Sequence, residues 1–131
     1  MMLDVDFFKQ YNDTYGHIEG DKALIHVAKS LRSVLQRPGD FVFRLGGEEF
    51  GVFLTDTGAE DAQALASKIC HSLEELKIPH ARNKASAYLT ISIGAVSCVA
   101  DETLDEEEII KQADKKLYEA KENGRNRYEF S

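Results

Sequence analysis

The sequence has few of the residues that cross-link or interrupt a small fold: two cysteines, two prolines and no tryptophan. Cys70 and Cys98 each stand in an apolar pattern without metal-ligand spacing, so we expect two reduced core thiols. No apolar run is long enough to span a bilayer, and the start of the chain carries no secretion signal. We therefore expect a cytoplasmic domain, with any membrane anchor lying elsewhere in the full-length protein.

The chain is also short of positive charge, with 16 Lys and Arg against 23 Asp and Glu and a net charge of -7. We expect no long nucleic acid as a partner, because a polynucleotide surface usually needs a basic face. A small phosphorylated ligand is compatible with this composition, since divalent cations and a few lysines offset its charge. At 131 residues and 43% hydrophobic, the chain suits a single domain over residues 1–131.

Hydrophobic periodicity predicts strands alternating with amphipathic helices. We predict strands at residues 1–5, 41–45, 50–54, 89–100 and 127–130. We predict helices at residues 21–36, at residues 57–73 and from Thr103 to near Gly124. Residues 6–20 read as a polar loop, and Gly94 reads as a β-bulge. This order predicts an α+β fold, a ferredoxin-like βαββαβ core with a mostly antiparallel sheet and a C-terminal αβ extension.

The segment Gly46-Gly47-Glu48-Glu49-Phe50 joins two of these strands and reads as the turn of a β-hairpin. Glycine accepts the positive φ of a tight turn, so Gly46 and Gly47 also leave room for a bulky group to come close. The alternative is an ordinary turn whose wet end carries charges. Two adjacent carboxylates at the tip favour a site only if the fold brings a second acidic cluster beside them.

Asp4 and Asp6 supply such a cluster at the end of the first predicted strand. Two residues apart on a strand, they project from one face, and the topology places this strand beside the hairpin. With Glu48 they would form a set of hard oxygen ligands suited to Mg²⁺ and to metal-assisted phosphoryl or nucleotidyl transfer. The alternative is that both residues merely end a strand.

Other polar residues have ordinary explanations when they are taken singly. Asp21 stands where a helix N-cap belongs. Lys121 and Arg125 lie four apart at a helix C-terminus, where cations suit the helix dipole. Phe7 and Phe8 could anchor the loop in the core. The functional interpretation gains weight because all these features would surround one end of one sheet.

A series of short motifs occurs in order over nearly the whole chain: Asp4-Val5-Asp6-Phe7-Phe8-Lys9, Asn12-Asp13, Gly16-His17, Gly20-Asp21, Arg44-Leu45-Gly46-Gly47-Glu48-Glu49-Phe50, Thr90-Ile91-Ser92-Ile93-Gly94, Ala113-Asp114, Tyr118-Glu119-Ala120-Lys121 and Gly124-Arg125-Asn126-Arg127. With these motifs the chain as a whole resembles the GGDEF domain of the diguanylate cyclases. The resemblance implies a fold like the palm of nucleotidyl cyclases and polymerases. It also implies condensation of two GTP into cyclic di-GMP and two pyrophosphates, with Mg²⁺ or Mn²⁺.

Site residues follow from the resemblance position by position. Asp4, the Val5 carbonyl and Glu48 would bind the metal, and Glu49 would activate the 3′-hydroxyl or support a second metal. The backbone around Phe7 and Phe8, with Lys9, would bind the phosphates, and Lys121 and Arg125 would contact the terminal phosphates. Asn12 and Asp21 would hydrogen-bond the guanine. Gly46 and Gly47 would allow the nucleotide to approach the hairpin closely. Each domain would hold one GTP, so activity would require a homodimer.

Product inhibition is a further implication of the resemblance. Arg37 and Asp40 match the family's inhibitory Arg-x-x-Asp site for cyclic di-GMP, and Lys68 would supply a further cation. Arginine presents a planar fork to phosphate or a guanine edge, and aspartate accepts from guanine. The alternative is that Pro38-Gly39 followed by a polar residue is simply a turn after a helix.

One departure from the family concerns the start of the domain. Family members begin with a further helix that carries Asp-x-Leu-Thr and Asn-Arg motifs and helps to wall the guanine pocket, and residues 1–131 lack it. Without that segment we expect weak GTP binding and little or no synthesis, with the product site better preserved. A catalytically silent receptor for cyclic di-GMP or GTP is the alternative function, and an N-terminal sensory domain is expected in the full-length protein.

Overall fold

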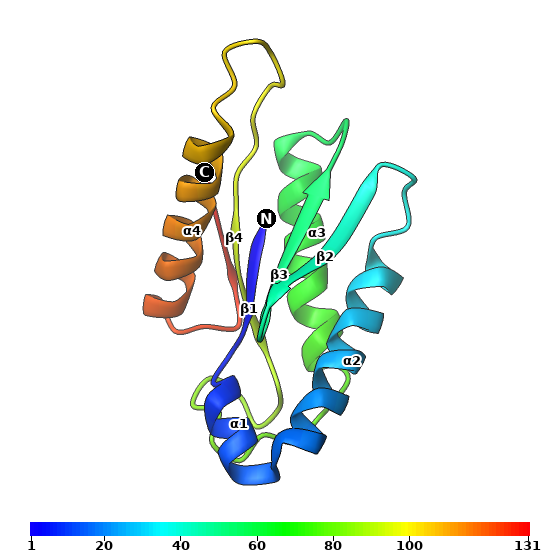
Figure 1. Ribbon diagram of the computed structural model, residues 1–131, viewed down its shortest axis with the longest axis vertical. Helices are drawn as coiled ribbons and strands as arrows, with labels where there is room; N and C mark the ends of the chain where they lie inside the picture. The colour runs from blue at the N-terminus through cyan, green and yellow to red at the C-terminus, as the bar shows by residue number, and fades with distance from the viewer.

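The computed structural model describes residues 1–131 as five strands and four helices (Figure 1). The strands are β1 (Met2–Val5), β2 (Asp40–Gly46), β3 (Glu49–Leu54), β4 (Ile91–Ala95) and β5 (Tyr128–Phe130). The helices are α1 (Phe8–Tyr15), α2 (His17–Val34), α3 (Ala59–Glu74) and α4 (Glu106–Glu122). None of these helices has the length and apolar character needed to cross a membrane.

The strands form one sheet in the order β2-β3-β1-β4-β5. β1 is antiparallel to both β3 and β4, and β2 is antiparallel to β3. β5 joins the edge parallel to β4, as the strand of a C-terminal αβ extension. The predicted α+β fold, with its ferredoxin-like core, is therefore confirmed.

The main core lies between one face of the sheet and the two helices α2 and α3. Alternate strand residues point into it, and its fully buried members include Leu3, Val5, Val27, Leu31, Ile69, Leu73, Ile91 and Ile93. Burial of each of these side chains contributes about 1.5–3 kcal/mol relative to an exposed position. This packing fixes β1 at the centre of the sheet, and with it the direction of Asp4 on the opposite face.

The opposite face of the sheet is only partly covered. α4 packs on the β4 and β5 side of the sheet, where Gly94 lies directly against the helix backbone at Ala113 and Leu117. The β2 and β3 side of this face carries exposed aromatic rings instead. The residues Phe41, Phe43 and Phe53 are 57%, 48% and 59% exposed.

The predicted loop at residues 6–20 is wrong, because the segment contains α1 and the first turn of α2. Phe8 and Tyr11 are buried three residues apart, so a single apolar stripe is enough to hold this short helix. The predicted N-cap at Asp21 is wrong as well. The N-cap of α2 is Gly16, and Asp21 lies inside the helix with its side chain exposed.

Three smaller predictions also differ from the structure. The fourth strand ends at Ala95 instead of residue 100, where the chain leaves the sheet. Gly94 pairs regularly with Met2, and the register shift lies between Arg44 and Gly46 at the hairpin. Cys70 is buried as expected, but Cys98 is exposed because it follows the end of the strand.

Candidate active site

The hairpin tip between β2 and β3 is tied to the end of β1. Gly46 and Gly47 adopt φ of +152° and +53°, values that a side chain would strain, so the predicted role of glycine in this turn is confirmed. The Arg44 Nε donates a hydrogen bond to the Gly47 carbonyl oxygen at 2.9 Å. The Val5 backbone nitrogen donates to the Glu48 carbonyl oxygen at 3.2 Å. The two glutamates therefore lie beside the central strand.

Acidic side chains from two strands converge with a lysine from α4 at this end of the sheet. Asp4 and Glu49 are direct partners in the antiparallel register, so their side chains share the face that α4 covers. Lys121 Nζ lies 3.2 Å from Asp4 Oδ2. The predicted neighbourhood of the first strand and the hairpin tip is thus present, with Lys121 paired to a carboxylate.

The electrostatics of this cluster are unfavourable for the ionised carboxyl of Asp4. Burial raises the pKa of Asp4 to about 6, and repulsion from Glu48 and Glu49 adds to the rise, while Lys121 opposes it. The side chain is nearly enclosed, with 8% of the residue exposed. At neutral pH the fold therefore holds a charge that one lysine does not fully compensate.

This imbalance leads to a prediction about stability. A folded-state pKa near 6, above the unfolded value of 3.8, contributes stability below pH 4 that is lost as pH rises through 6. Without divalent cations, we expect Asp4→Asn to raise the free energy of unfolding at pH 7.5 by no more than about 3 kcal/mol. Urea denaturation at pH 7.5 and 4.5 measures it, and the gain should shrink at the lower pH.

The control for this prediction is Asp13→Asn, which removes an exposed carboxylate from α1. It should leave the free energy of unfolding nearly unchanged at both pH values. An Asp4→Asn variant that is less stable than the parent at pH 7.5 would contradict the prediction.

The donor set at this end of the sheet is compatible with a divalent cation. Asp4, Glu48 and the Val5 carbonyl would offer hard oxygen ligands, and the raised pKa of Asp4 marks a carboxylate that lacks countercharge. No group of three His, Cys, Asp or Glu side chains is arranged as a complete metal site. Mg²⁺ commonly takes only one or two protein carboxylates and completes its shell with water and substrate phosphates.

Asp6 does not belong to the acidic cluster predicted from the sequence. It follows β1, is 1% exposed, and accepts hydrogen bonds from the Thr90 and Ser92 hydroxyls at 2.8 and 2.6 Å. The Asn126 backbone nitrogen donates a third, at 3.1 Å. Burial raises the pKa of Asp6, and these donors oppose the rise. Both carboxylate oxygens are occupied, so Asp6 links β1, β4 and the turn after α4.

The turn between β1 and α1 forms a second wall of the site. Phe7 adopts the left-handed conformation, with φ of 52°, and leads into α1. The guanidinium carbon of Arg125 stands 4.4 Å from the centre of the Phe7 ring, a cation–π contact. Phe8 is buried in the core, whereas Lys9 is exposed in the first turn of α1. The turn between β1 and α1 lies at the same end of the sheet as the tip of the β2–β3 hairpin (Figure 1).

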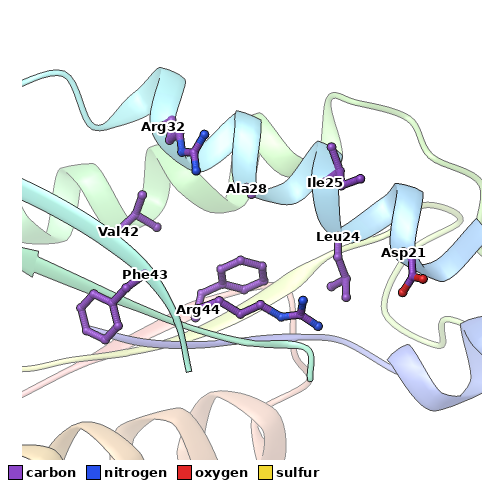
Figure 2. A pocket seen from close by; sticks show the side chains of 9 residues that line it. Asp21, Leu24, Ile25, Ala28, Arg32, Val42, Phe43 and Arg44 are labelled. Carbon is purple, nitrogen blue, oxygen red and sulfur yellow. The ribbon is translucent and has the colours of Figure 1, made fainter. Parts of the chain in front are cut away.

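A groove of about 460 Å³ runs between α2 and β2. Figure 2 shows Asp21, Leu24 and Ile25 on its helical side and Val42 and Arg44 on its strand side. Leucine and isoleucine give it an apolar wall, Asp21 and the Arg44 guanidinium lie toward one end of it, and Arg32 lies toward the other (Figure 2).

Asn12 lies close to Asp21 through a tight contact between α1 and α2. Its Oδ1 is buried without a hydrogen-bond donor, and it packs against Gly20, where any Cβ would overlap it. The two predicted guanine-binding residues therefore flank one glycine, although Asp21 is exposed and Asn12 is half-buried.

The predicted inhibitory residues lie at the other end of β2. The Arg37 guanidinium donates to the Thr57 hydroxyl at 2.9 Å and to the carbonyls of Thr55 and Asp56. Asp40 Oδ1 is buried without a hydrogen-bond partner. Lys68 is exposed on α3 and forms no ion pair. Arg37 and Asp40 are thus adjacent across one turn, whereas no contact links Lys68 to them.

Two residues near the site were not singled out from the sequence. Arg44 lies in the hairpin motif without a predicted role of its own, yet it holds the turn through Gly47. His80 lies in a segment without periodicity and contacts the backbone of Phe7. No local pattern marks either role, since both depend on contacts that only the folded chain creates.

Comparison with known families decides what kind of domain this is. The family model described as "Diguanylate cyclase, GGDEF domain" matches residues 1–127. The chain belongs to the GGDEF family. Diguanylate cyclase A of Treponema denticola is 47% identical to this GGDEF domain over 131 residues, which are 100% of the chain and 34% of that protein. Diguanylate cyclase VdcA of Vibrio cholerae is 40% identical over 128 residues, 97% of the chain and 37% of that protein.

Solved structures support the same assignment. The GGDEF domain of DgcB from Caulobacter crescentus, in complex with c-di-GMP, matches with a TM-score of 0.84 and 30% identity, covering 98% of this chain and 74% of that one. The active GGEEF domain of a diguanylate cyclase from Vibrio cholerae matches with a TM-score of 0.79 and 33% identity, covering 98% and 79%. The predicted palm-like fold is confirmed. This GGDEF domain spans about a third of the length of the two curated relatives described above.

Proposed function

We propose that this GGDEF domain condenses two GTP into cyclic di-GMP and two pyrophosphates, in the cytoplasm, where GTP is available. One observation carries the proposal: Asp4, Glu48 and Glu49 converge at one end of the sheet beside Lys121. A site without ligands would have no physical reason to gather repelling carboxylates around a nearly buried aspartate.

Asp4, Glu48 and the Val5 carbonyl would hold Mg²⁺, or Mn²⁺, together with the phosphates of GTP. The cation supplies charge neutralisation of the phosphates when it is bound. Glu49 either takes the proton of the attacking 3′-hydroxyl or supports a second cation. In the absence of a ligand, Lys121 offsets the charge of Asp4. With a cation beside Asp4, the Lys121 ammonium would become available to a terminal phosphate.

Triphosphate binding involves the turn between β1 and α1. The backbone of Phe7 and Phe8 and the Lys9 ammonium contact the phosphates, since the start of a helix presents unpaired N–H groups. Arg125, stacked on Phe7, contacts the terminal phosphates from the other side. Gly46 and Gly47 carry no side chain at the tip, so the substrate can approach the hairpin backbone closely.

Guanine selection involves Asn12 and Asp21 at the end of the groove between α2 and β2. A carboxylate accepts from the N1 and N2 donors of guanine, a pattern that adenine cannot present. The buried Asn12 Oδ1 has no partner within the protein, which supports its use as an acceptor for a ligand.

Each chain holds one GTP, so the reaction requires two domains facing each other as a homodimer. We propose that residues 1–131 form one domain of a longer protein that also carries an N-terminal sensory domain. The chain spans 34% and 37% of the two curated relatives described above, which supports further segments in the longer protein.

Cyclic di-GMP would inhibit the enzyme at Arg37 and Asp40. The buried and unpartnered Asp40 Oδ1 supports this site, because a guanine N–H would satisfy it. Arg37 would exchange its bonds to residues 55–57 for the ligand. Of the three residues proposed for this site, Lys68 has the least structural support, because no contact orients its side chain toward the turn.

A second candidate function is a catalytically silent receptor for cyclic di-GMP or GTP. The complex of DgcB with c-di-GMP favours some form of dinucleotide binding in the family. The convergence of Asp4, Glu48 and Glu49 favours the enzyme, because a receptor that uses Arg37 and Asp40 does not need it.

The test is incubation of the full-length protein with GTP and Mg²⁺, followed by chromatography of the nucleotides. We expect cyclic di-GMP from the parent and none above background from Glu48→Ala, because the variant loses a ligand oxygen at the metal. A parent that is dimeric, binds cyclic di-GMP and forms no product would establish the receptor instead.

A further inference from the structure

His80 lies between α3 and β4, in a stretch that forms neither helix nor strand. The residue is 1% exposed, so its imidazole is enclosed by the protein. Its Nε2 lies 3.0 Å from the Phe7 carbonyl oxygen, and its Nδ1 is buried without a partner. A polar ring held in a loop by a single bond to a distant backbone atom is not explained by packing alone.

The geometry fixes the protonation of this ring. A carbonyl oxygen is only an acceptor, so Nε2 must carry the hydrogen and donate it to Phe7. Burial lowers the pKa of His80, which favours the neutral ring with one N–H group. Nδ1 then carries no hydrogen and needs no acceptor.

The Phe7 carbonyl belongs to a strained position of the backbone. A bulky residue at φ of 52° costs on the order of 1–3 kcal/mol and persists only when its surroundings hold it. Two donors converge on this oxygen: the Tyr11 backbone nitrogen at 3.0 Å, which closes the first turn of α1, and His80. Only the second of these bonds comes from outside the local chain.

The loop around His80 is itself docked on α1. The Tyr11 ring meets the imidazole edge-on, with ring centres 5.2 Å apart. The Ala81 backbone nitrogen donates to the Tyr15 hydroxyl at 2.9 Å. The donor therefore approaches Phe7 from a fixed direction, which a mobile loop could not provide.

We propose that His80 is a positioning residue that holds the Phe7 turn in the shape that receives the triphosphate of GTP. The inference rests on the proposed function, in which this turn contacts the phosphates. His80 is remote from the carboxylates and acts through the Phe7 backbone. Because the Phe7 ring contacts Arg125, His80 also influences the position of Arg125. Loss of the His80 bond lets Phe7 relax toward an ordinary backbone conformation, and the phosphate-binding groups then move.

The experiment compares His80→Leu, which fills the space without a donor, with His80→Gln, whose amide nitrogen can occupy the place of Nε2. His80→Asn is a second donor-free test, because its shorter amide does not reach Phe7, and it is used if the leucine variant fails to fold. Dissociation constants are measured in the full-length protein with Mg²⁺ for 3′-deoxy-GTP, which lacks the nucleophilic hydroxyl, and for GMP.

We expect His80→Leu to weaken 3′-deoxy-GTP binding about tenfold or more, as loss of one buried hydrogen bond would. GMP binding should change much less, and His80→Gln should restore most of the affinity for 3′-deoxy-GTP. In turnover, KM for GTP should rise more than kcat falls.

Three outcomes would overturn the inference. Unchanged 3′-deoxy-GTP affinity in the donor-free variant that folds would remove the role of the hydrogen bond while leaving the proposed function intact. Equal weakening of 3′-deoxy-GTP and GMP, with no recovery in His80→Gln, would reduce His80 to a packing residue. A parent protein that binds neither nucleotide would overturn the proposed function itself, and the inference with it.

Discussion

Replacing Glu49 with glutamine is expected to lower the rate of cyclic di-GMP formation by about 10³-fold, within the range of 10²–10⁴ typical of a lost acid or base. Glutamine keeps the shape of the side chain but removes its charge and its capacity to accept a proton. Glu49 is the register partner of Asp4, so the change acts inside the acidic cluster. Initial rates at saturating GTP and Mg²⁺, followed by chromatography, measure the loss.

The matched control for Glu49→Gln is Glu60→Gln, which changes an exposed glutamate in the first turn of α3. It should leave the rate within about twofold of the parent, because it touches no part of the site. Retention of more than a tenth of the parental rate in Glu49→Gln would refute a direct role for this carboxylate.

A titration of Glu49→Gln with Mn²⁺ separates the two roles left open for Glu49. Recovery of the rate at high Mn²⁺ would assign Glu49 to the second cation, because a weakened metal site can be refilled by mass action. A loss that no metal concentration repairs would assign it to proton transfer. Either result defines the chemistry of the hairpin tip.

The second large effect is expected on stability, from Gly94→Ala. A Cβ at residue 94 would overlap the Ala113 carbonyl oxygen and the Leu117 backbone nitrogen of α4. Backbone atoms inside a helix cannot move aside alone, so the whole helix must shift. We expect a loss of about 3 kcal/mol in the free energy of unfolding, at the upper end of overpacking costs. Urea denaturation at pH 7.5 measures it.

Gly58→Ala is the control for the glycine substitution. Gly58 has an ordinary extended backbone before α3, and no atom lies within 4 Å of the added carbon. Its stability should stay within about 0.5 kcal/mol of the parent. Equal losses in the two variants would mean that the contact between β4 and α4 does not restrict residue 94. A displaced α4 would also carry Lys121 and Arg125 away from the site.

Much of the fold could be predicted because its strongest signals are local. The stripe Leu24, Val27 and Leu31 gives a helix of period 3.6, and Gly46-Gly47 between two apolar runs gives a hairpin. The sheet order then follows from the succession of elements, since few topologies accommodate it.

The failures arise where tertiary contacts outweigh local pattern. α1 has only Phe8 and Tyr11 on its buried side, so its eight residues look like a polar loop in the sequence. In the folded chain, contacts with the core and with the loop at His80 stabilise the helix. Gly94 shows the reverse case. A glycine in a strand suggests a bulge, but here its lack of a side chain admits the backbone of α4.

The site was only partly predictable for the same reason. The proximity of Asp4 to the hairpin tip follows from topology, and the structure shows it. The different roles of Asp4 and Asp6 cannot be predicted in this way. Both are aspartates at the end of the same strand, and they differ only in the side chains and backbone groups that surround them in the folded chain. Asp4 meets Lys121 and the glutamates, whereas Asp6 meets two hydroxyls and the Asn126 backbone.

Under the proposed function, the incompletely compensated charge at Asp4 would link the lifetime of the domain to the supply of GTP. A cation and a nucleotide that bind only the native state raise the free energy of unfolding by RT ln(1 + [L]/Kd). They would also remove the electrostatic cost that burial imposes on Asp4. When GTP is scarce, a larger fraction of the chains would therefore unfold and be degraded by proteases. The GTP concentration would then govern the abundance of the protein as well as its rate of turnover.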